Sequence, residues 1–314
     1  MNKRVYGVIG IKSIMSNWNA DFSGHPKSIS TGEVFGSDKA LKYPMKKIWQ
    51  NNGEKVLYIK TLIMNKKGIK IVPKTLQERY EELFDIKDLK KEKDPSVVLS
   101  NLFKSIDVKQ FGATFAVADF NFSITGAVQI GQGFNKYSDT VPEVQQILSP
   151  FKDSTKADAE QSTLGTKIMS DEAHYFYPFV INPKAYDEFV TLGVTDGYTE
   201  DDYKSFKEIA LINATAFNTN SKMGCENEFA LFIDTEENTY LPDLAQYITF
   251  EKGSEKNNIE IKIDGLLEGI KDRVLELQIY YNPYQVTISN LEELKKAIGS
   301  MKVFNIFTKE ELTI

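Results

Sequence analysis

The sequence predicts an α+β protein, and three observations support this class. A helical segment lies between two strand-like segments within the first 64 residues, a second set of alternating strands and helices follows residue 229, and helical patterns fill residues 75–105. The 314 residues are 41% hydrophobic and 26% charged, an ordinary globular composition. A chain of this length buries a sizeable core as one large domain or two smaller ones.

The N-terminal elements follow from apolar patterns and helix caps. Residues 3–14 have the pattern of a buried strand, and a polar loop follows them. Ser37 or Asp38 is expected to cap a helix that runs to about residue 51. Pro44 lies well inside this helix and should kink it or shift its start.

A strand, a helical insertion and a hairpin are expected next. Residues 56–64 alternate like a strand, so the opening has a β-loop-α-β order that suits a ferredoxin-like, RRM-type sheet and is shared by many α+β folds. Residues 75–105 predict two helices joined by a charged stretch. Residues 111–117 and 122–130 predict a buried hairpin. Residues 136–170 are polar and have no sustained period beyond a short amphipathic piece at 142–148, and connections of this length are functional or mobile.

The C-terminal part supplies a second β-α-β set. Its expected elements are strands at 173–183, 229–234, 259–263 and 274–281, and helices at 199–216, 266–272 and 290–298. Thr199 is the expected cap of the first of these helices. The sequence contains no internal repeat.

Charge is uneven along the chain. Fourteen Lys and Arg residues and four Asp and Glu residues give residues 1–75 a net charge of +10, while the whole chain carries −6. Residues 76–314 therefore carry −16. The basic N-terminal quarter predicts a face for a polyanion, or alternatively a solvated basic face with no partner.

Composition argues against several kinds of site. The single cysteine, Cys225, allows no intrachain disulfide, and with only His25 and His174 the chain lacks the residues for a multi-Cys/His zinc site. The sequence has neither the P-loop pattern nor a complete dinucleotide-binding glycine pattern. We therefore expect no cofactor and no bound metal, and we expect both histidines to be satisfied or exposed.

The apolar runs predict a cytoplasmic protein. The N-terminal run, residues 5–11, has no cleavage site after it and predicts a strand. The longest charge-free stretch, residues 120–135, contains polar residues and glycines and falls short of a bilayer span. We therefore expect no membrane partner.

The loop at residues 16–32 concentrates short polar side chains, and two interpretations of it are open. The side chains can cap their own backbone. Alternatively, Asn17, Asn19 and Lys27 can follow a phosphodiester backbone while Trp18 offers a stacking face.

The following helix carries a row of lysines. Lys39, Lys42 and Lys46 are spaced i, i+3, i+7 and share one face, and Lys47 flanks it. This row is either a solvated face or a surface that meets phosphates. The segment KQFGATFAV, residues 109–117, loosely resembles the aromatic RNA-binding strand of RRM proteins, although its Phe residues are better explained as core.

Several stretches together resemble a known family. They are RVYGVIGIKSIMSNWNADFSGHPKS, GEVFGSDKALKYPMKK, FGATFAVADFNFSITGAVQIGQGFNKYSD, STLGTKIMSDEAHYFYPFVIN, and YKSFKEIALINATAFNT with ENEFALFID. In this order they cover most of the chain and are similar to the multi-copy backbone subunit of type I CRISPR interference complexes. This is the "CRISPR-associated seven" family of the RAMP superfamily, in its type I-B branch. The ordered set, rather than any single motif, carries the resemblance.

The resemblance implies a right-hand-shaped protein. Its RRM-like palm comprises residues 1–65, 111–135 and 171–314, its helical fingers residues 66–110, and its extended thumb residues 136–170. Subunits of this family assemble head to tail along the guide RNA (crRNA), kink bases out with their thumbs and hold the guide for pairing with target DNA. The implied partners are crRNA, target DNA through the crRNA, neighbouring copies and other Cascade subunits, while cleavage belongs to other proteins.

The resemblance also assigns residues to the guide. The loop at 17–27 and the segment 37–47 match family stretches that touch the guide backbone, and residues 111–113 match a stretch near the kinked nucleotide. The expected RNA-binding residues are Lys12, Asn17, Trp18, Asn19, Lys27, Ser37, Lys42, Lys46, Lys47, Phe111, Gly112, Ala113, Gln129 and Lys136. We expect no catalytic residue.

Two other function classes are open. Related backbone subunits of other CRISPR types cut target RNA with a metal-bound aspartate in the first loop, so a metal-dependent endoribonuclease is the alternative. Asp21 is its candidate residue, but alone it supplies few hard oxygen ligands, and Asp38 is better explained as a helix cap. A free-standing metabolic enzyme is the third class, and the missing cofactor motifs argue against it.

Overall fold

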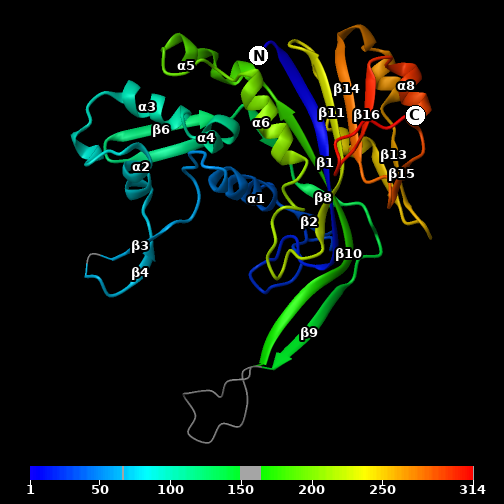
Figure 1. The fold of residues 1–314 in the computed structure, drawn as a ribbon, viewed down its shortest axis with the longest axis horizontal. Coiled ribbons are helices and arrows are strands. Elements are labelled where there is room, and N and C mark those ends of the chain that lie inside the picture. Colours follow the sequence, from blue (N-terminus) through cyan, green and yellow to red (C-terminus); the bar gives the residue numbers. More distant parts are fainter. Residues whose placement is uncertain (66, 149–163, 314) are drawn as a thin grey trace, which may run out of the picture.

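The computed structural model describes residues 1–65, 67–148 and 164–313, and in these residues the chain is an α+β protein arranged around one large sheet (Figure 1). The strand order is β16-β14-β11-β1-β10-β8-β2, and β7 and β9 also pair with β10. The pairing is antiparallel except between β14 and β16. The strands are β1 (Lys3–Ser16), β2 (Phe35–Gly36), β7 (Val128–Ile130), β8 (Gly133–Asn135), β9 (Pro142–Leu148), β10 (Leu164–Ile181), β11 (Cys225–Glu236), β14 (Val274–Tyr281) and β16 (Met301–Asn305).

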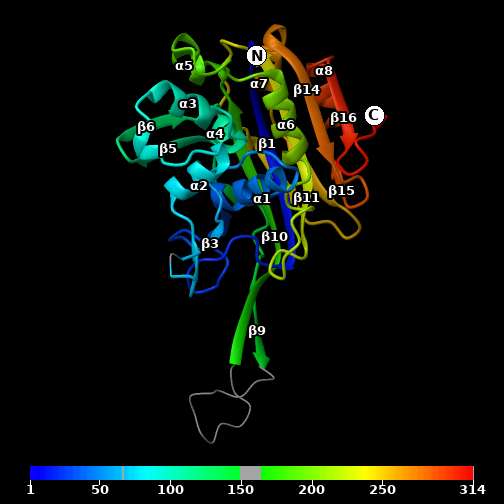
Figure 2. The same ribbon diagram turned by 60° about the vertical axis from the view of Figure 1, so that its left-hand side comes forward.

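Helices α1 (Asp38–Asn51) and α6 (Glu200–Ala210) cover one face of this sheet (Figure 2). The buried side of α1 carries Leu41, Met45 and Trp49, which are spaced four residues apart and therefore form one apolar stripe. This stripe packs with inward side chains of β1, β10 and β11 in a first hydrophobic core.

Both helices begin where the sequence predicts. Oγ of Ser37 accepts a hydrogen bond from the N–H of Ala40 at 3.3 Å, and Thr199 forms a capping box with Asp202. Pro44 lies buried inside α1, and the helix starts at its cap in spite of it, so the expected shift of the helix start is wrong.

Helix α6 ends at Ala210, six residues before the expected end. The reason is the buried side chain of Asn227, which lies on β11. Its Nδ2 donates to the carbonyl of Ala210 at 2.8 Å, and its Oδ1 accepts from the N–H of Ala214 at 2.9 Å. The Asn227 side chain thus takes the carbonyl of Ala210 and the N–H of Ala214, which would bond to each other in a continuous helix.

A second core lies on the opposite face of the sheet. Side chains of β1, β11 and β14 pack there against a small three-stranded sheet and two short helices. These elements are the strands β12 (Ile248–Glu251), β13 (Asn257–Ile261) and β15 (Val286–Ile288) and the helices α7 (Asp264–Glu268) and α8 (Leu291–Ala297). The 3-10 helix η3 (Leu244–Tyr247) also packs in this core, and η4 (Lys271–Arg273) leads into β14. The predicted second set of strands and helices is confirmed.

A helical lobe lies beside α1 (Figure 1). Its elements are α2 (Leu76–Phe84), η1 (Leu89–Lys91), α3 (Pro95–Phe103) and α4 (Ile106–Phe111), and η2 (Pro183–Tyr186) and α5 (Asp187–Thr191) adjoin them. Thr75 and Asp94 cap α2 and α3, so these two predicted helices are confirmed. Helix α4 was not expected.

The prediction of a strand at residues 56–64 is wrong for most of these residues. Only β3 (Leu62–Met64) is a strand, and it pairs with β4 (Ile71–Pro73) in a separate hairpin. The N–H groups of Leu57 and Tyr58 instead donate to the carboxylate of Asp107, each at 2.8 Å. A buried side chain therefore satisfies the backbone where a strand partner was expected.

The hairpin expected after residue 111 forms, but it is not buried as a whole. Strands β5 (Gly112–Val117) and β6 (Phe120–Thr125) make their own two-stranded sheet. Of its side chains, Phe115 and Ile124 are buried, while those between them are partly or fully exposed. Only one face of the hairpin packs on the lobe.

The polar segment expected to lack regular structure contains a β-ribbon. Strand β9 pairs with the first part of β10, from Pro142 opposite Ser170 to Leu148 opposite Leu164, and both views show this ribbon projecting from the body (Figures 1 and 2). All seven residues of β9 are exposed. The short amphipathic piece noted at residues 142–148 is this strand, and because both of its faces are exposed, its pattern does not distinguish a strand from an isolated amphipathic segment.

No helix within the described residues is long and apolar enough to cross a membrane. The expected cytoplasmic location stays a prediction.

Candidate nucleic-acid interface

The loop after β1 is folded tightly by its own groups. Oδ1 of Asp21 accepts hydrogen bonds from the N–H groups of Ser23 and His25, at 2.8 and 3.0 Å, and from the hydroxyl of Ser23. These hydrogen bonds hold the pKa of Asp21 below its ordinary value, and the bond from the Ser23 hydroxyl has the largest effect. Asp21 thus caps its own backbone, in line with the first of the two interpretations of this loop.

Trp18 points into the core, so the expected stacking face is wrong. Its side chain is fully buried, and its Nε1–H donates to the hydroxyl of Tyr177 at 2.5 Å. The ammonium group of Lys222 lies 4.9 Å from its ring centroid. Gly36 packs so closely on this pair that a Cβ there would lie 1.7 Å from the Tyr177 oxygen.

Three polar residues of the expected site hold the loop in place. Asn17 is buried, and its Nδ2 donates to the carbonyls of Gly24 and Ile168 at 2.9 and 3.1 Å. Oδ1 of Asn19 accepts from the N–H of Ser37 at 2.7 Å, and Ser37 also caps α1. Asn17 therefore offers no exposed donor to a phosphodiester backbone.

Two lysines of α1 turn toward the helical lobe. The ammonium groups of Lys42 and Lys46 lie 5.1 and 6.0 Å from the ring centroid of Phe111. Lys42 pairs with Asp38 at 2.9 Å, and Lys46 pairs with the buried carboxylate of Asp107 at 3.4 Å. A phosphate can reach these lysines only by competing with an existing ion pair.

Lys27, Lys39 and Lys47 are accessible to a phosphate in that no ion pair within the described residues occupies them, although only Lys39 is exposed and the other two are half-buried. In the described part of the chain none of the three has an acidic partner. Lys39 is exposed, Lys27 lies 5.5 Å from the ring of Phe35, and Lys47 donates to Oε1 of Gln50 at 3.0 Å. These ammonium groups can meet a phosphate without breaking an ion pair.

The stretch from Phe111 to Ala113 joins α4 to β5 beside α1. Phe111 and Ala113 are half-buried. Gly112 has φ +75°, and a Cβ there would lie 2.1 Å from the carbonyl oxygen of Ile124. Because only glycine fits this backbone, Gly112 has a structural role here.

Two other expected residues, Lys12 and Gln129, lie on the opposite face of the sheet from α1. Side chains alternate along a strand, and the neighbours of both residues belong to the first core. Lys12 pairs with Glu226 at 2.8 Å and donates to Gln285 at 2.6 Å. Gln129 donates to the carbonyl of Gly126 at 2.8 Å. The structure therefore does not bring these two residues together with the α1 lysines.

A cleft of about 310 Å³ lies between the loop and the root of the ribbon. Its lining includes Asp21, His25 and Ser28 from the loop and Thr140 and Pro142 from the ribbon. The last expected residue, Lys136, lies close to this root, where its N–H donates to a carbonyl of β10 at 2.8 Å. The loop, α1 and the ribbon root thus form one continuous candidate interface.

The model of the family described as CRISPR-associated protein Cas7 matches residues 3–264. The chain belongs to the Cas7 family. A chain of a CRISPR RNA-guided surveillance complex, pre-nicking, has a similar fold, with TM-score 0.53, 15% sequence identity and 96% of each chain covered. A chain of another CRISPR RNA-guided surveillance complex gives TM-score 0.45 at 11% identity over 88% of each chain. No curated protein matches.

The predicted family is thus confirmed, while the type I-B branch stays a prediction. In this Cas7 chain the sequence analysis missed an aromatic residue, Phe22. Its side chain is fully exposed, and it lies between Asp21 and Ser23, whose hydrogen bonds fix the turn. An aromatic residue flanked by two turn-forming residues is the signal that could have revealed it.

The acids near the loop of this Cas7 chain are engaged in the fold. Asp21 binds its own loop, and Asp38 pairs with Lys42 in the first turn of α1. Within residues 1–65, 67–148 and 164–313, no group of three or more His, Cys, Asp or Glu side chains is placed to hold a metal ion.

Proposed function

We propose that this Cas7 chain is a non-catalytic, crRNA-binding backbone subunit of a type I-B CRISPR surveillance complex. It assembles head to tail along the crRNA, contacts the other Cascade subunits and presents the guide for pairing with target DNA. The observation that carries this proposal is the accessible cationic surface of Lys27, Lys39 and Lys47, which lies in the basic N-terminal quarter of a chain of this family.

The proposed palm has a ferredoxin-like order. Strands β11, β1, β10 and β8 lie side by side in that order, with α1 between β1 and β8 in the chain and α6 between β10 and β11. This is the β-α-β-β-α-β arrangement. We assign residues 1–65, 111–135 and 171–314 to the palm, 66–110 to the fingers and 136–170 to the thumb.

The proposed guide path follows the loop and α1. Phosphates meet the accessible lysines, and a base stacks on Phe22 rather than on Trp18. The ion-paired Lys42 and Lys46 line the side toward Phe111, where they orient the helical lobe against α1.

Exposed apolar residues on the ribbon support a contact with the neighbouring copy. Val141, Val144, Ile147 and Leu148 are 48–59% exposed, and because side chains alternate along a strand, Val144 and Leu148 lie on one face of the ribbon and Ile147 on the other. We also expect the apolar residues Phe151 and Leu164 of segment 136–170 to take part in this contact, but Phe151 and the side chain of Leu164 lie outside the described residues. A ribbon on one copy that meets a different surface on the next makes a heterologous contact, which generates an open filament.

Binding of single-stranded RNA at increasing salt tests this proposal. Each phosphate contact contributes about 0.7 to the log–log slope, so the wild-type protein should lose affinity steeply as salt rises, without sequence preference. With Mg²⁺ or Mn²⁺ present, complementary RNA should stay intact. Binding that ignores salt contradicts the proposal, and metal-dependent cleavage that Asp21→Ala abolishes replaces it with the endoribonuclease alternative.

A further inference from the structure

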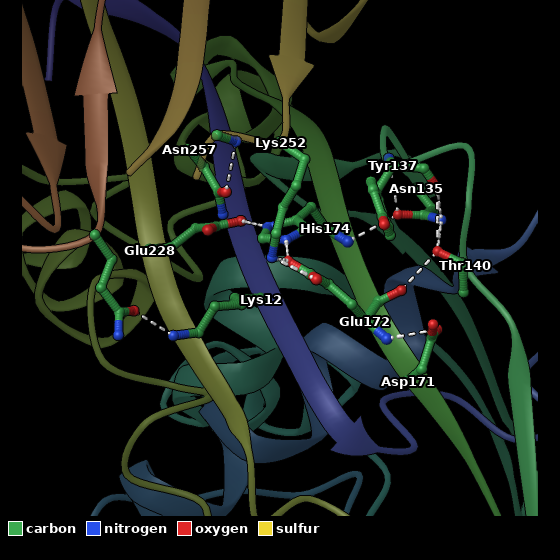
Figure 3. A network of polar contacts seen from close by, with 12 residues as sticks. Lys12, Asn135, Tyr137, Thr140, Asp171, Glu172, His174, Glu228, Lys252 and Asn257 are labelled. Carbon is green, nitrogen blue, oxygen red and sulfur yellow. Dashed lines mark hydrogen bonds and ion pairs between the residues drawn. The ribbon is translucent and has the colours of Figure 1, made fainter. Parts of the chain in front are cut away.

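The histidine at the root of the ribbon lies between two carboxylates (Figure 3). His174, on β10, is fully buried. Its Nδ1 lies 2.6 Å from Oε1 of Glu228 on β11, and its Nε2 lies 3.0 Å from Oε1 of Glu172 on β10. The ring stacks on Phe250 of β12, with ring centroids 3.9 Å apart. The other histidine, His25, is exposed, as expected.

This geometry favours a charged ring. A neutral imidazole has one donor and one acceptor nitrogen. Here each nitrogen faces a carboxylate oxygen, so beside two ionised carboxylates a neutral ring would direct one lone pair at a negatively charged oxygen. When both carboxylates are ionised, only the imidazolium form donates to both.

Glu228 depends on this positive charge. Its side chain is 2% exposed, and within the described residues its Oε2 has no hydrogen-bond partner. If His174 lost its proton, Glu228 would be a buried carboxylate without a cation, which is strongly unfavourable. The histidine and the glutamate therefore stabilise each other.

The surrounding charges come from four elements. On β10, Glu172 also pairs with Lys252, which follows β12, at 2.5 Å. On β1, Lys12 lies opposite His174 in the ladder and pairs with Glu226 of β11. Asp171 precedes this group on β10. Figure 3 shows Glu172, Lys252, Lys12 and Asp171 around His174.

The pKa directions agree with this charge distribution. Burial alone would lower the pKa of His174, but the negative charge of Glu228 and the hydrogen bonds to both glutamates raise it overall. Burial would raise the pKa of Glu172, but its hydrogen bonds from His174 and Lys252 lower it overall.

The same segment of β10 holds the root of the ribbon. The N–H of His174 donates to Oδ1 of Asn135 at 2.7 Å, and its carbonyl accepts from the N–H of Lys136 at 2.8 Å. The hydroxyl of Thr140 donates to the carbonyl of residue 172 at 2.6 Å, and the N–H of Val141 donates to Oδ1 of residue 171 at 2.7 Å. Residues 171–174 thus position residues 135–141.

We propose that His174 is a positively charged positioning residue that locks the root of the β9–β10 ribbon, so that loss of its proton loosens the ribbon. Resting on the proposed function, the inference adds that assembly on guide RNA weakens as pH rises and His174 loses its proton. A group with a raised folded-state pKa contributes stability below its unfolded pKa, and this contribution is lost as pH rises through the folded pKa.

The first experiment measures the charge and the ribbon without RNA. Nitrogen-15 NMR of the two histidines, with His174 assigned from His174→Gln, should show a doubly protonated ring at pH 7. Hydrogen-exchange protection of the β9 amides, corrected for the intrinsic pH dependence, should fall by about tenfold or more as His174 deprotonates, because a buried carboxylate that loses its cation is strongly unfavourable. A neutral His174 at pH 7, or protection that does not change with its titration, overturns the inference.

The second experiment uses a matched set of variants. His174→Gln leaves Glu228 unpaired and should lose ribbon protection, whereas His174→Gln with Glu228→Gln removes both charges and should restore it and make it independent of pH. Glu172→Gln keeps the buried pair and serves as the milder variant if the single His174 change fails to fold. Equal protection in the single and double variants would contradict the charge-based mechanism.

Binding of single-stranded oligo-uridine RNA across the same pH range completes the test. Wild-type affinity should fall as His174 deprotonates, and the double variant should show no such step. If the wild-type protein binds no RNA at any pH, the proposed function fails, while the NMR and exchange results still decide the role of His174. RNA affinity with no step at the His174 titration overturns the coupling.

Discussion

The two halves of β10 belong to one strand and have opposite surroundings. In the half nearest its end, Tyr175, Tyr177 and Phe179 face the first core while Phe176 faces the second. In the half nearest its start, the strand pairs with β9, whose residues are all exposed. One half therefore stabilises the fold, and the other is available to a partner.

The same division holds in the rest of the candidate interface. In the first loop, Trp18 is buried and Phe22 is exposed. On α1, Lys46 is paired with a buried acid and Lys39 is exposed without an acidic partner in the described chain. Residue type alone therefore does not identify a binding residue in this protein.

The largest expected effect comes from shortening the ribbon. Gln145 lies opposite Lys167 in the ladder, so replacing residues 146–166 by Asn-Gly joins them through a two-residue turn. Both cores remain, and the free energy of unfolding in urea should change by less than about 0.5 kcal/mol. Filament formation on crRNA, followed by electron microscopy, should be lost.

Two outcomes would contradict the division of β10 into a half that stabilises the fold and a half that is available to a partner. Regular filaments of the shortened protein would show that the ribbon is not the contact with the neighbour. An unfolded body would show that the ribbon belongs to the core.

The two aromatic residues of the first loop should separate stability from binding. Trp18→Ala removes a fully buried side chain and should lower the free energy of unfolding by about 3–5 kcal/mol. Phe22→Ala should leave stability unchanged and weaken RNA binding by about 1–3 kcal/mol, the contribution of one stacked base. Urea unfolding and RNA titration of both variants measure the difference, and a destabilised Phe22 variant with normal RNA binding would reverse the assignment.

The smallest effects are expected from single lysines. Lys39→Ala and Lys47→Ala should each flatten the salt dependence of RNA binding by about 0.7 in the log–log slope. Lys46→Ala leaves the buried Asp107 without its cation, so it should instead lower the free energy of unfolding by about 1–3 kcal/mol. Salt titrations combined with urea unfolding compare the two classes, and equal behaviour of all three variants would mean that ion pairing does not distinguish them.

The sequence predicts those parts of the fold that local contacts determine. The starts of α1 and α6 were predictable because Ser37 and Thr199 bind backbone groups three residues away. The irregular path at residues 56–58 was not, because Asp107, about fifty residues later, holds it. Residues 142–148 stood out as a short amphipathic piece, but their pairing with residues 164–170 was missed because the exposed strand has no buried face.

The candidate site was predictable as a region and less so residue by residue. Lysine spacing on α1 shows which side chains share a face, but the partner that occupies Lys46 comes from α4. The burial of Trp18 depends on Tyr177, which is 159 residues away in the chain. Such contacts leave no local sequence pattern.

A small change of angle at the hydrogen-bonded root causes a larger displacement at the far end of the ribbon. The seven residues of β9, at about 3.3 Å each, give an arm of about 23 Å. A tilt of about 5° at the root would displace the end of such an arm by about 2 Å. A change of this size in a donor–acceptor distance breaks a hydrogen bond. In a row of copies, each angular error would add to the previous one. The stiffness of the few contacts at the root would then determine how regular the angle and spacing between successive copies are in a long assembly.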